Sequence, residues 1–246
     1  SFDSDGFALG ADVKVNTNAE AYVAWNWKES ATSGFDIVTA TGTGSAHTIA
    51  HSLSAVPNLI ISKEKSGSIN DWVVYHHKNT SAPETDKVIL NEINATSDDS
   101  CWNDTVPTSS VFSVGTTSVT NRTDSTYVYY LWSEKQGFSK FGSYTGNGNA
   151  DGTYVHLGFR PAFLMVKATS TTSAWYIYDN KRAGYNVENY QLYPDRSNAE
   201  DTTDQVDLLS NGFKWQAITG DPNSSGRTYI YMAFAEAPFV NSNGVP

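Results

Sequence analysis

Residues 34–76 read GFDIVTATGTGSAHTIAHSLSAVPNLIISKEKSGSINDWVVYH, and residues 137–179 read GFSKFGSYTGNGNADGTYVHLGFRPAFLMVKATSTTSAWYIYD. The second stretch repeats landmarks of the first at an offset of 103 or 104 residues (72 to 175, 57 to 161). These landmarks are Pro57 and Pro161, Lys63 and Lys167, Trp72 and Trp175, and Tyr75 and Tyr178. Self-similarity at a fixed spacing is the signature of a repeated structural unit. We therefore predict that the chain builds one unit twice, and we call this stretch the first block.

A second block occurs three times. Its copies are DGFALGADVKVNTNAEAYVAWNWKE (residues 5–29), SVFSVGTTSVTNRTDSTYVYYLWSE (110–134) and NGFKWQAITGDPNSSGRTYIYMAFAE (211–236). Each copy has a strand with Phe, a polar turn, a long aromatic strand and a closing Glu. The predicted unit is thus a first block, a variable connector and a second block, with a repeat of about 100 residues. Residues 1–29 are then the end of an earlier unit, with a first β unit at 1–134 and a second at 135–246.

The aromatic strand of the second block alternates with period two, which is typical of a half-buried β-strand. We predict that its large apolar face is the buried one. That face carries Val23, Trp25 and Trp27 in the first copy, Val128, Tyr130 and Trp132 in the second, and Ile230, Met232 and Phe234 in the third. Asn58–Lys63 and Ala162–Lys167 are nearly continuous apolar runs, which predict central strands. The connectors, about 79–109 and 180–209, are predicted loops, with one short helix near Asp204–Leu209. The predicted fold class is all-β, with tandem antiparallel β-sandwich-like units.

Composition limits the partners. The formal net charge is −10 and the pI is about 4.8, so nucleic acid and anionic membrane surfaces would be repelled. No apolar run is long enough to span a bilayer. Cys101 is the only cysteine, which excludes an internal disulfide or a multi-cysteine zinc site. The chain begins at Ser1 without a signal peptide, and we expect it to be part of something larger.

The loop GNGNADG, residues 146–152, has three possible roles. A phosphate cradle would need a helix after the glycines, but Thr153, Tyr154 and Val155 follow and resemble a strand. The spacing of Asn147, Asn149 and Asp151 imitates the start of a calcium loop, although Gly158 stands where a bidentate Glu is needed. A hairpin turn is the favoured interpretation, and the three polar residues remain a candidate cation site. The histidines show no metal-ligand spacing that recurs in both units.

No arrangement of residues predicts catalysis, and we expect neither an enzyme nor a cofactor. Glu29, Glu134 and Glu236 recur in every second block, which favours a structural role over the paired carboxylates of a glycosidase. Non-repeated aromatic residues in or near the variable connectors are the candidate ligand-binding residues, because rings on loops stack against sugars. These candidates are Trp102, Trp215, Tyr185, Tyr190 and Tyr193, and we expect them to be partly exposed.

Several strings in the chain resemble a repeat module of virion structural proteins from marine tailed bacteriophages, which are often described as tail-fibre-like or uncharacterised. The matching strings include GFSKFGSYTGNGNADGTYVHLGFRPAFLMVKATS, WYIYD, LSNGF, TYIYMAFAE and AYVAWNWKE, and the resemblance covers essentially the whole chain. It implies a virion protein with other virion proteins as partners, and by analogy a homo-oligomer, most often a trimer. The resemblance provides no catalytic motif.

Three functions are therefore expectations from the sequence. The first is a tail-fibre or appendage module, located in the virion, that displays and attaches to a host surface glycan or receptor. The second is a decoration or scaffold protein of the capsid surface without a ligand. The third is a glycan-degrading spike enzyme.

Overall fold

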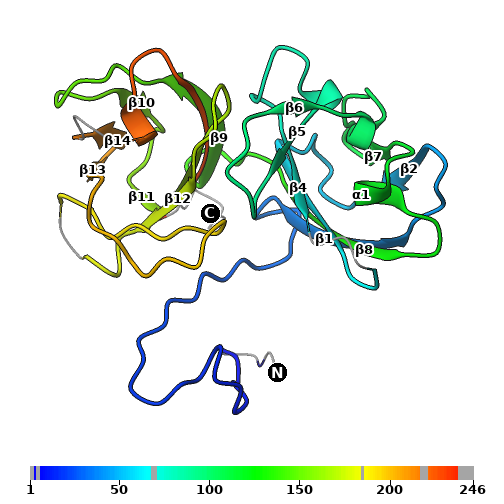
Figure 1. The fold of residues 1–246 in the computed structure, drawn as a ribbon, viewed down its shortest axis with the longest axis horizontal. Coiled ribbons are helices and arrows are strands. Elements are labelled where there is room, and N and C mark those ends of the chain that lie inside the picture. The colour runs from blue at the N-terminus through cyan, green and yellow to red at the C-terminus, as the bar shows by residue number, and fades with distance from the viewer. Residues whose placement is uncertain (1–2, 4–5, 68–70, 184–185, 217–220, 238–246) are drawn as a thin grey trace.

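The computed structural model describes residues 3, 6–67, 71–183, 186–216 and 221–237. Figure 1 shows two β-rich lobes side by side, with the N-terminal segment extending away beneath them. We call residues 6–29 the arm, residues 30–134 the first lobe and residues 135–237 the second lobe. Among the described residues, the helices are one four-residue α-helix, α1 (Ser118–Asn121), and three short 3-10 helices. The predicted all-β class is confirmed.

The first lobe contains a large and a small antiparallel sheet. The large sheet has the strand order β1 (Phe35–Thr41), β8 (Thr126–Trp132), β3 (Leu59–Glu64), β4 (Trp72–His76), β5 (Asp86–Ile89) and β6 (Ser97–Asp98). The small sheet pairs β2 (His47–Ala50) with β7 (Val111–Val114). The 3-10 helices η1 (Pro83–Thr85) and η2 (Ser100–Trp102) lie in the connector.

The second lobe is built in the same way. Its large sheet has the order β12 (Trp175–Asp179), β11 (Pro161–Ala168), β15 (Thr228–Ala235) and β9 (Ser139–Thr145). Its small sheet has the order β10 (Tyr154–His156), β14 (Gly212–Trp215) and β13 (Val206–Leu209), and η3 (Asp221–Asn223) precedes β15. The predicted central strands are confirmed, because β3 and β11 each have a neighbour on both sides.

Corresponding strands of the two lobes share both order and register. The order β1-β8-β3-β4 in the first lobe matches β9-β15-β11-β12 in the second. The register pairs Leu59 with Trp132 in the first lobe, and the corresponding Phe163 with Phe234 in the second. The pairing between β3 and β4 also agrees with that between β11 and β12. The two stretches that are similar in sequence therefore follow the same chain path.

The two large sheets pack against each other, so their central strands carry buried residues on both faces. On β8, Tyr127 and Leu131 point into the core of the first lobe, while Trp132 faces a layer between the lobes. On β15, Tyr229 lies in the core of the second lobe and Phe234 lies in the layer between the lobes. The face predicted to be buried is buried on β15, but on β8 only Trp132 is buried, while Val128 and Tyr130 are half-buried. The tyrosine face opposite is buried on both strands.

Three local predictions are wrong. The connector 79–109 is not simply a loop, because it contains β5 and β6 of the large sheet together with η1 and η2. The segment Asp204–Leu209 contains strand β13 and no helix; Val206 and Leu208 alternate into the core while β13 pairs with β14. The GNGNADG loop is not a hairpin turn either. It joins β9 of the large sheet to β10 of the small sheet, and these two strands pair with different neighbours. The loop is therefore a corner between two sheets.

Residues 21–29 of the arm keep the predicted alternation but belong to none of the sheets of the described residues. Val23, Trp25 and Trp27 are half-buried, while the residues between them are exposed. Residues 21–29 make no backbone-to-backbone hydrogen bond with any residue that the structure describes. The indole rings of Trp25 and Trp27 instead pack against the layer between the lobes.

Candidate functional site

The glycine corners are fixed by one buried asparagine in each lobe. In the first lobe, Asn121 accepts a hydrogen bond from Thr43 N (2.8 Å) and donates to Ser45 O (2.8 Å). In the second lobe, Asn223 accepts from Asn147 N (3.2 Å) and donates to Asn149 O (3.1 Å). Both side chains are fully buried. Because the same anchor recurs in both lobes, the corner has a structural role.

The polar tip of the corner in the second lobe uses its side chains internally. Asn147 Oδ1 accepts hydrogen bonds from Asn149 N (3.0 Å) and from Asn223 Nδ2 (2.9 Å). The carboxylate of Asp151 pairs with Lys214, and this hydrogen bond and charge lower the pKa of Asp151. The three candidate residues Asn147, Asn149 and Asp151 are thus close together but engaged with protein donors. Within the described ranges, no three His, Cys, Asp or Glu side chains lie together as a possible metal site.

Two of the predicted ligand-binding residues are core residues. Trp102 is 1% exposed and Trp215 is 0% exposed, so the expected exposure is wrong for both. Trp102, on η2, packs edge-to-face on Tyr75 with 5.9 Å between ring centroids. Trp215, on β14, packs in the same way on Tyr178 at 5.7 Å. Tyr75 and Tyr178 are corresponding residues, so each tryptophan fills the same place in its own lobe.

The two predicted tyrosines that the structure describes, Tyr190 and Tyr193, differ in their surroundings. Tyr185 lies outside the described residues. Tyr193 is half-buried, and its hydroxyl donates to Asp201 (2.9 Å) and accepts from Gln191 (2.7 Å). Tyr190 is 37% exposed and lines a surface groove of about 600 Å³ between the arm and the second lobe. Tyr190 and Tyr193 are therefore both partly exposed, as expected, and Tyr190 is the more exposed of the two.

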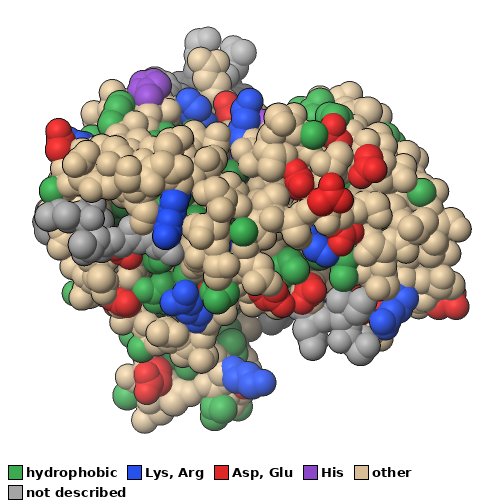
Figure 2. Space-filling view, turned by 45° about the horizontal axis from the view of Figure 1, so that its top comes forward, with side chains coloured by type: hydrophobic (Ala, Val, Ile, Leu, Met, Phe, Trp, Pro, Cys, Tyr) green, Lys and Arg blue, Asp and Glu red, His purple; other side chains and the backbone are tan. Residues whose placement is uncertain are grey.

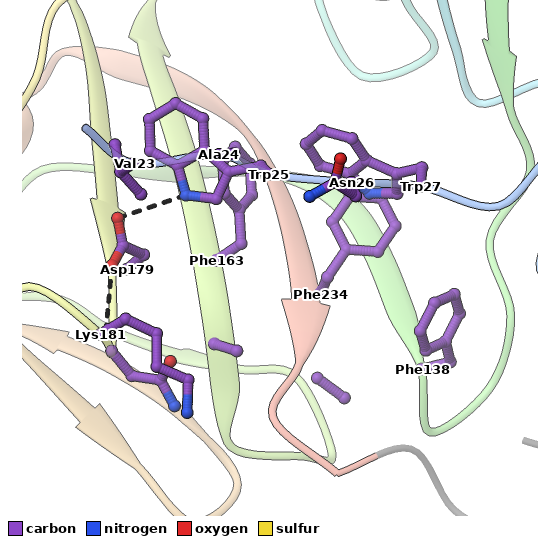
Figure 3. Close-up of a pocket in the computed structure, with 13 residues that line it drawn as sticks. Val23, Ala24, Trp25, Asn26, Trp27, Phe138, Phe163, Asp179, Lys181 and Phe234 are labelled. Atoms are coloured by element: carbon purple, nitrogen blue, oxygen red, sulfur yellow. Dashed lines mark hydrogen bonds between the residues drawn. The ribbon is translucent and has the colours of Figure 1, made fainter. Parts of the chain in front are cut away.

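An aromatic pocket of about 290 Å³ lies where the arm crosses the second lobe (Figure 3). Its walls include rings of both the arm and the sheet, and amide, carboxylate and amine side chains also line it. Trp25 packs edge-to-face on Phe163 (5.6 Å between centroids), and Trp27 does so on Phe163 and Phe234 (both 5.4 Å). The polar residues that line the pocket are Asn26, Asp179, Asn180 and Lys181.

Asp179 holds this pocket together. Its Oδ2 accepts a hydrogen bond from the indole of Trp25 (3.2 Å) and from Arg182 Nε (2.7 Å), and its Oδ1 accepts from the backbone of Lys181 (3.0 Å). The side chain of Asp179 is 3% exposed, and Figure 3 shows it below the Trp25 ring. Both carboxylate oxygens of Asp179 already accept hydrogen bonds from the protein. We therefore assign this residue to positioning the arm. Lys181 and Asn26 are exposed and are the polar groups that a ligand can reach.

Two histidines connect the lobes. His76 Nε2 donates to the carbonyl of Tyr231 (3.1 Å), and His77 Nε2 donates to the carbonyl of Phe141 (3.0 Å). The backbone N–H of Lys78 donates to His76 Nδ1 (3.1 Å), so His76 is held in its neutral form. Burial lowers the pKa of His76 to about 3 and also lowers the pKa of His77. These contacts are structural, and no sequence pattern predicts them, because they join residues far apart in the chain.

The pocket was missed in the sequence because Trp25 and Trp27 were assigned to a strand core. Period-two alternation cannot separate the two settings, because it is the same for a strand in a core and for an extended segment on the surface of a lobe. Among the described residues, no helix is long and apolar enough to cross a membrane.

Comparison with known proteins gives a family without a function. Searches of curated proteins and of solved structures found no match. The model of one protein family, described as a domain of unknown function (DUF7483), matches residues 1–238. Because this match spans almost the whole chain, the chain belongs to the DUF7483 family.

Proposed function

We propose that this chain is a structural module of a virion appendage, such as a tail fibre, that displays and attaches to a host surface glycan. The resemblance to virion proteins of tailed bacteriophages supports the location. The aromatic pocket supports the attachment, and it is the observation on which the proposal depends. The proposed role includes no catalytic step and no cofactor.

The pocket has the chemistry that sugar recognition requires. A pyranose ring packs its C–H face on an aromatic ring, and its hydroxyls bond to a few fixed polar groups. Trp25 and Trp27 are half-buried, so the pocket walls are fixed by packing while part of each ring remains at the surface. Lys181 can donate to a hydroxyl, and Asn26 can both donate and accept. The volume suits one sugar ring with its neighbours outside the pocket.

The scaffold suits display. Two lobes whose central strands carry buried residues on both faces form a rigid body, and the arm crosses it through side-chain contacts. Binding residues on loops and segments held by a rigid β scaffold are a common arrangement. In the proposed assembly the partners are other virion proteins and further copies of this chain.

Binding to an array of bacterial surface glycans tests the proposal. We expect a subset of glycans to bind the wild-type chain, and the double variant Asn26→Ala, Lys181→Ala to lose roughly tenfold or more in affinity. The matched control is Tyr154→Ala, because Tyr154 is also exposed (43%) but lies on β10 outside the pocket. Labelled antibody on intact virions tests the location.

The alternatives predict different results. Capsid labelling together with no glycan binding would indicate a decoration protein without a ligand. Shortened polysaccharide after incubation with the chain would indicate a glycan-degrading enzyme. Glycan binding that is weakened equally by Tyr154→Ala and by the double variant would refute the assigned pocket.

A further inference from the structure

The arm has the local structure of a second block even though it belongs to neither lobe. In the first lobe, the backbone N–H of Arg122 donates to the hydroxyl of Tyr127, five residues later (2.9 Å). In the second lobe, Ser224 N donates in the same way to Tyr229 (3.0 Å). The arm repeats this turn, with Thr17 N donating to the Tyr22 hydroxyl (2.9 Å). A second hydrogen bond is also shared. The Tyr127 hydroxyl donates to the carbonyl of Ser118, nine residues earlier, and the Tyr22 hydroxyl donates to the carbonyl of Val13 at the same spacing.

The inward face of this third copy is exposed, although it is buried in the other two. Tyr22 is 51% exposed, while the corresponding Tyr127 and Tyr229 are both 0% exposed. The same contrast holds for the preceding strand. Phe7 is 41% and Leu9 is 50% exposed, whereas their counterparts Phe112, Val114, Phe213 and Trp215 are buried in the lobe cores. Figure 2 shows hydrophobic side chains at the surface of the arm and where it meets the lobes.

The outward face of the arm is already in place. Trp27, Trp132 and Phe234 occupy corresponding positions in the three second blocks. All three belong to or pack against the layer between the lobes; the Trp27 ring lies 6.2 Å from Trp132 and 5.4 Å from Phe234. The layer between the lobes is therefore contacted by side chains of the arm as well as by both large sheets.

We propose that the arm is the closing part of a third lobe, which is completed by a first-block segment from outside residues 6–237. The partner is a further segment with the pattern of residues 34–76 or 137–179, and not these residues of a second copy, because their strands already flank β8 and β15. In each complete lobe, the aromatic strand lies between two first-block strands: β8 between β1 and β3, and β15 between β9 and β11. The place between these first-block strands is occupied by β8 in the first lobe and by β15 in the second. Neither lobe can therefore also provide strand partners for residues 21–29.

The side chains of the arm limit the shape of the third core. Ala24 and Asn26 stand where the first lobe has Tyr129 and Leu131. The third core is therefore thinner at that end, and Tyr22, Phe7 and Leu9 supply most of its apolar surface.

Adding the missing segment tests the proposal. Residues 30–109, a first block with its connector, would be fused directly before Asp5 of the full chain, in the order that these blocks have in the first lobe. We expect the backbone amides of residues 21–29 to exchange with deuterium roughly tenfold or more slowly than in the natural chain, because they gain strand partners. The matched control carries Ile60→Asp in the added copy only. Ile60 is fully buried in the lobe core, so this control should leave the arm amides unprotected.

Three outcomes would overturn the proposal. The added segment could leave the exchange of residues 21–29 unchanged, or the Ile60→Asp copy could protect the arm as well as the intact copy does. Alternatively, the natural chain could dimerise on light scattering and show protected arm amides that are lost on dilution. The last result would make a second copy of the chain the partner. The test does not involve glycan binding and is independent of the proposed function.

Discussion

Acidification should weaken the contact between the lobes through His76. This side chain is 1% exposed and uses both ring nitrogens: Nε2 donates to the Tyr231 carbonyl, and Nδ1 accepts from the backbone of Lys78. Protonating Nδ1 breaks the second bond and places a charge in the buried layer. The pKa of His76 is accordingly lowered from 6.5 to about 3, mainly by burial.

The sign and size of the effect follow from this shift. The unfolded chain binds a proton at His76 below about pH 6.5, whereas the folded chain does so only near pH 3. His76 therefore stabilises the fold fully above about pH 6.5, and this contribution falls as the pH drops toward 3. Each pH unit in this window is worth about 1.4 kcal/mol. At about pH 4.5 the expected loss is roughly 2.7 kcal/mol of unfolding free energy.

Urea unfolding of the wild type and of His76→Gln, followed by tryptophan fluorescence, measures this loss. Glutamine keeps a donor near the Nε2 position but does not titrate. Other groups titrate in the same window: burial raises the pKa of Glu188 to about 7 and of Asp204 to about 6. Their effects are common to both proteins and cancel in the difference. Between about pH 7.5 and pH 4.5, wild type should lose about 2–3 kcal/mol more than the variant. Equal losses would refute the reasoning.

Other predictions concern packing, the glycine corners and the cysteine. Trp132→Ala should lower the unfolding free energy by about 3–5 kcal/mol. Trp27→Ala should lower it by about 1–2 kcal/mol, because the Trp27 ring is only half-buried. Equal effects of the two variants in urea unfolding would contradict the assigned burial. Asn223→Ala should cost about 2–4 kcal/mol through its lost hydrogen bonds to the corner, and Asn121→Ala should act similarly in the first lobe; thermal shifts near zero would show that the corners are not anchored. Cys101 is buried with a raised pKa, so Ellman's reagent should label it only on unfolding, and prompt labelling at about pH 8 would contradict this.

The strands were predictable from the sequence because each is a local pattern. Asn58–Lys63 predicts β3 through its continuous apolar run, and the alternation of Thr126–Trp132 predicts β8. The stacking of the two large sheets was not predictable. Trp132 and Tyr127 both look like core residues, and periodicity cannot tell a lobe core from a layer between lobes.

The candidate site was predicted poorly for a related reason. Trp102 lies in a connector, and Trp215 stands at a second-block position that holds Val114 in the first unit. Neither tryptophan is repeated, and from this lack of repetition we predict exposure. The alternation of Phe213 and Trp215 along β14 would have indicated burial. The aromatic pocket depends on the path of the arm across the second lobe, which is a tertiary contact without a sequence pattern.

Trp102 and Trp215 also show how such a duplicated fold can diverge. The position in β7 that corresponds to Trp215 holds Val114, and the space that this smaller side chain leaves is filled by Trp102 from the connector. Each lobe core thus contains a large side chain packed against Tyr75 or Tyr178. This side chain comes from a connector in the first lobe and from a strand in the second. The connector of the first lobe is constrained by packing because it provides this indole ring, whereas the connector of the second lobe does not provide it. A change in the connector at Trp102 therefore disturbs the core of the first lobe, whereas in the second lobe the same place is filled from β14.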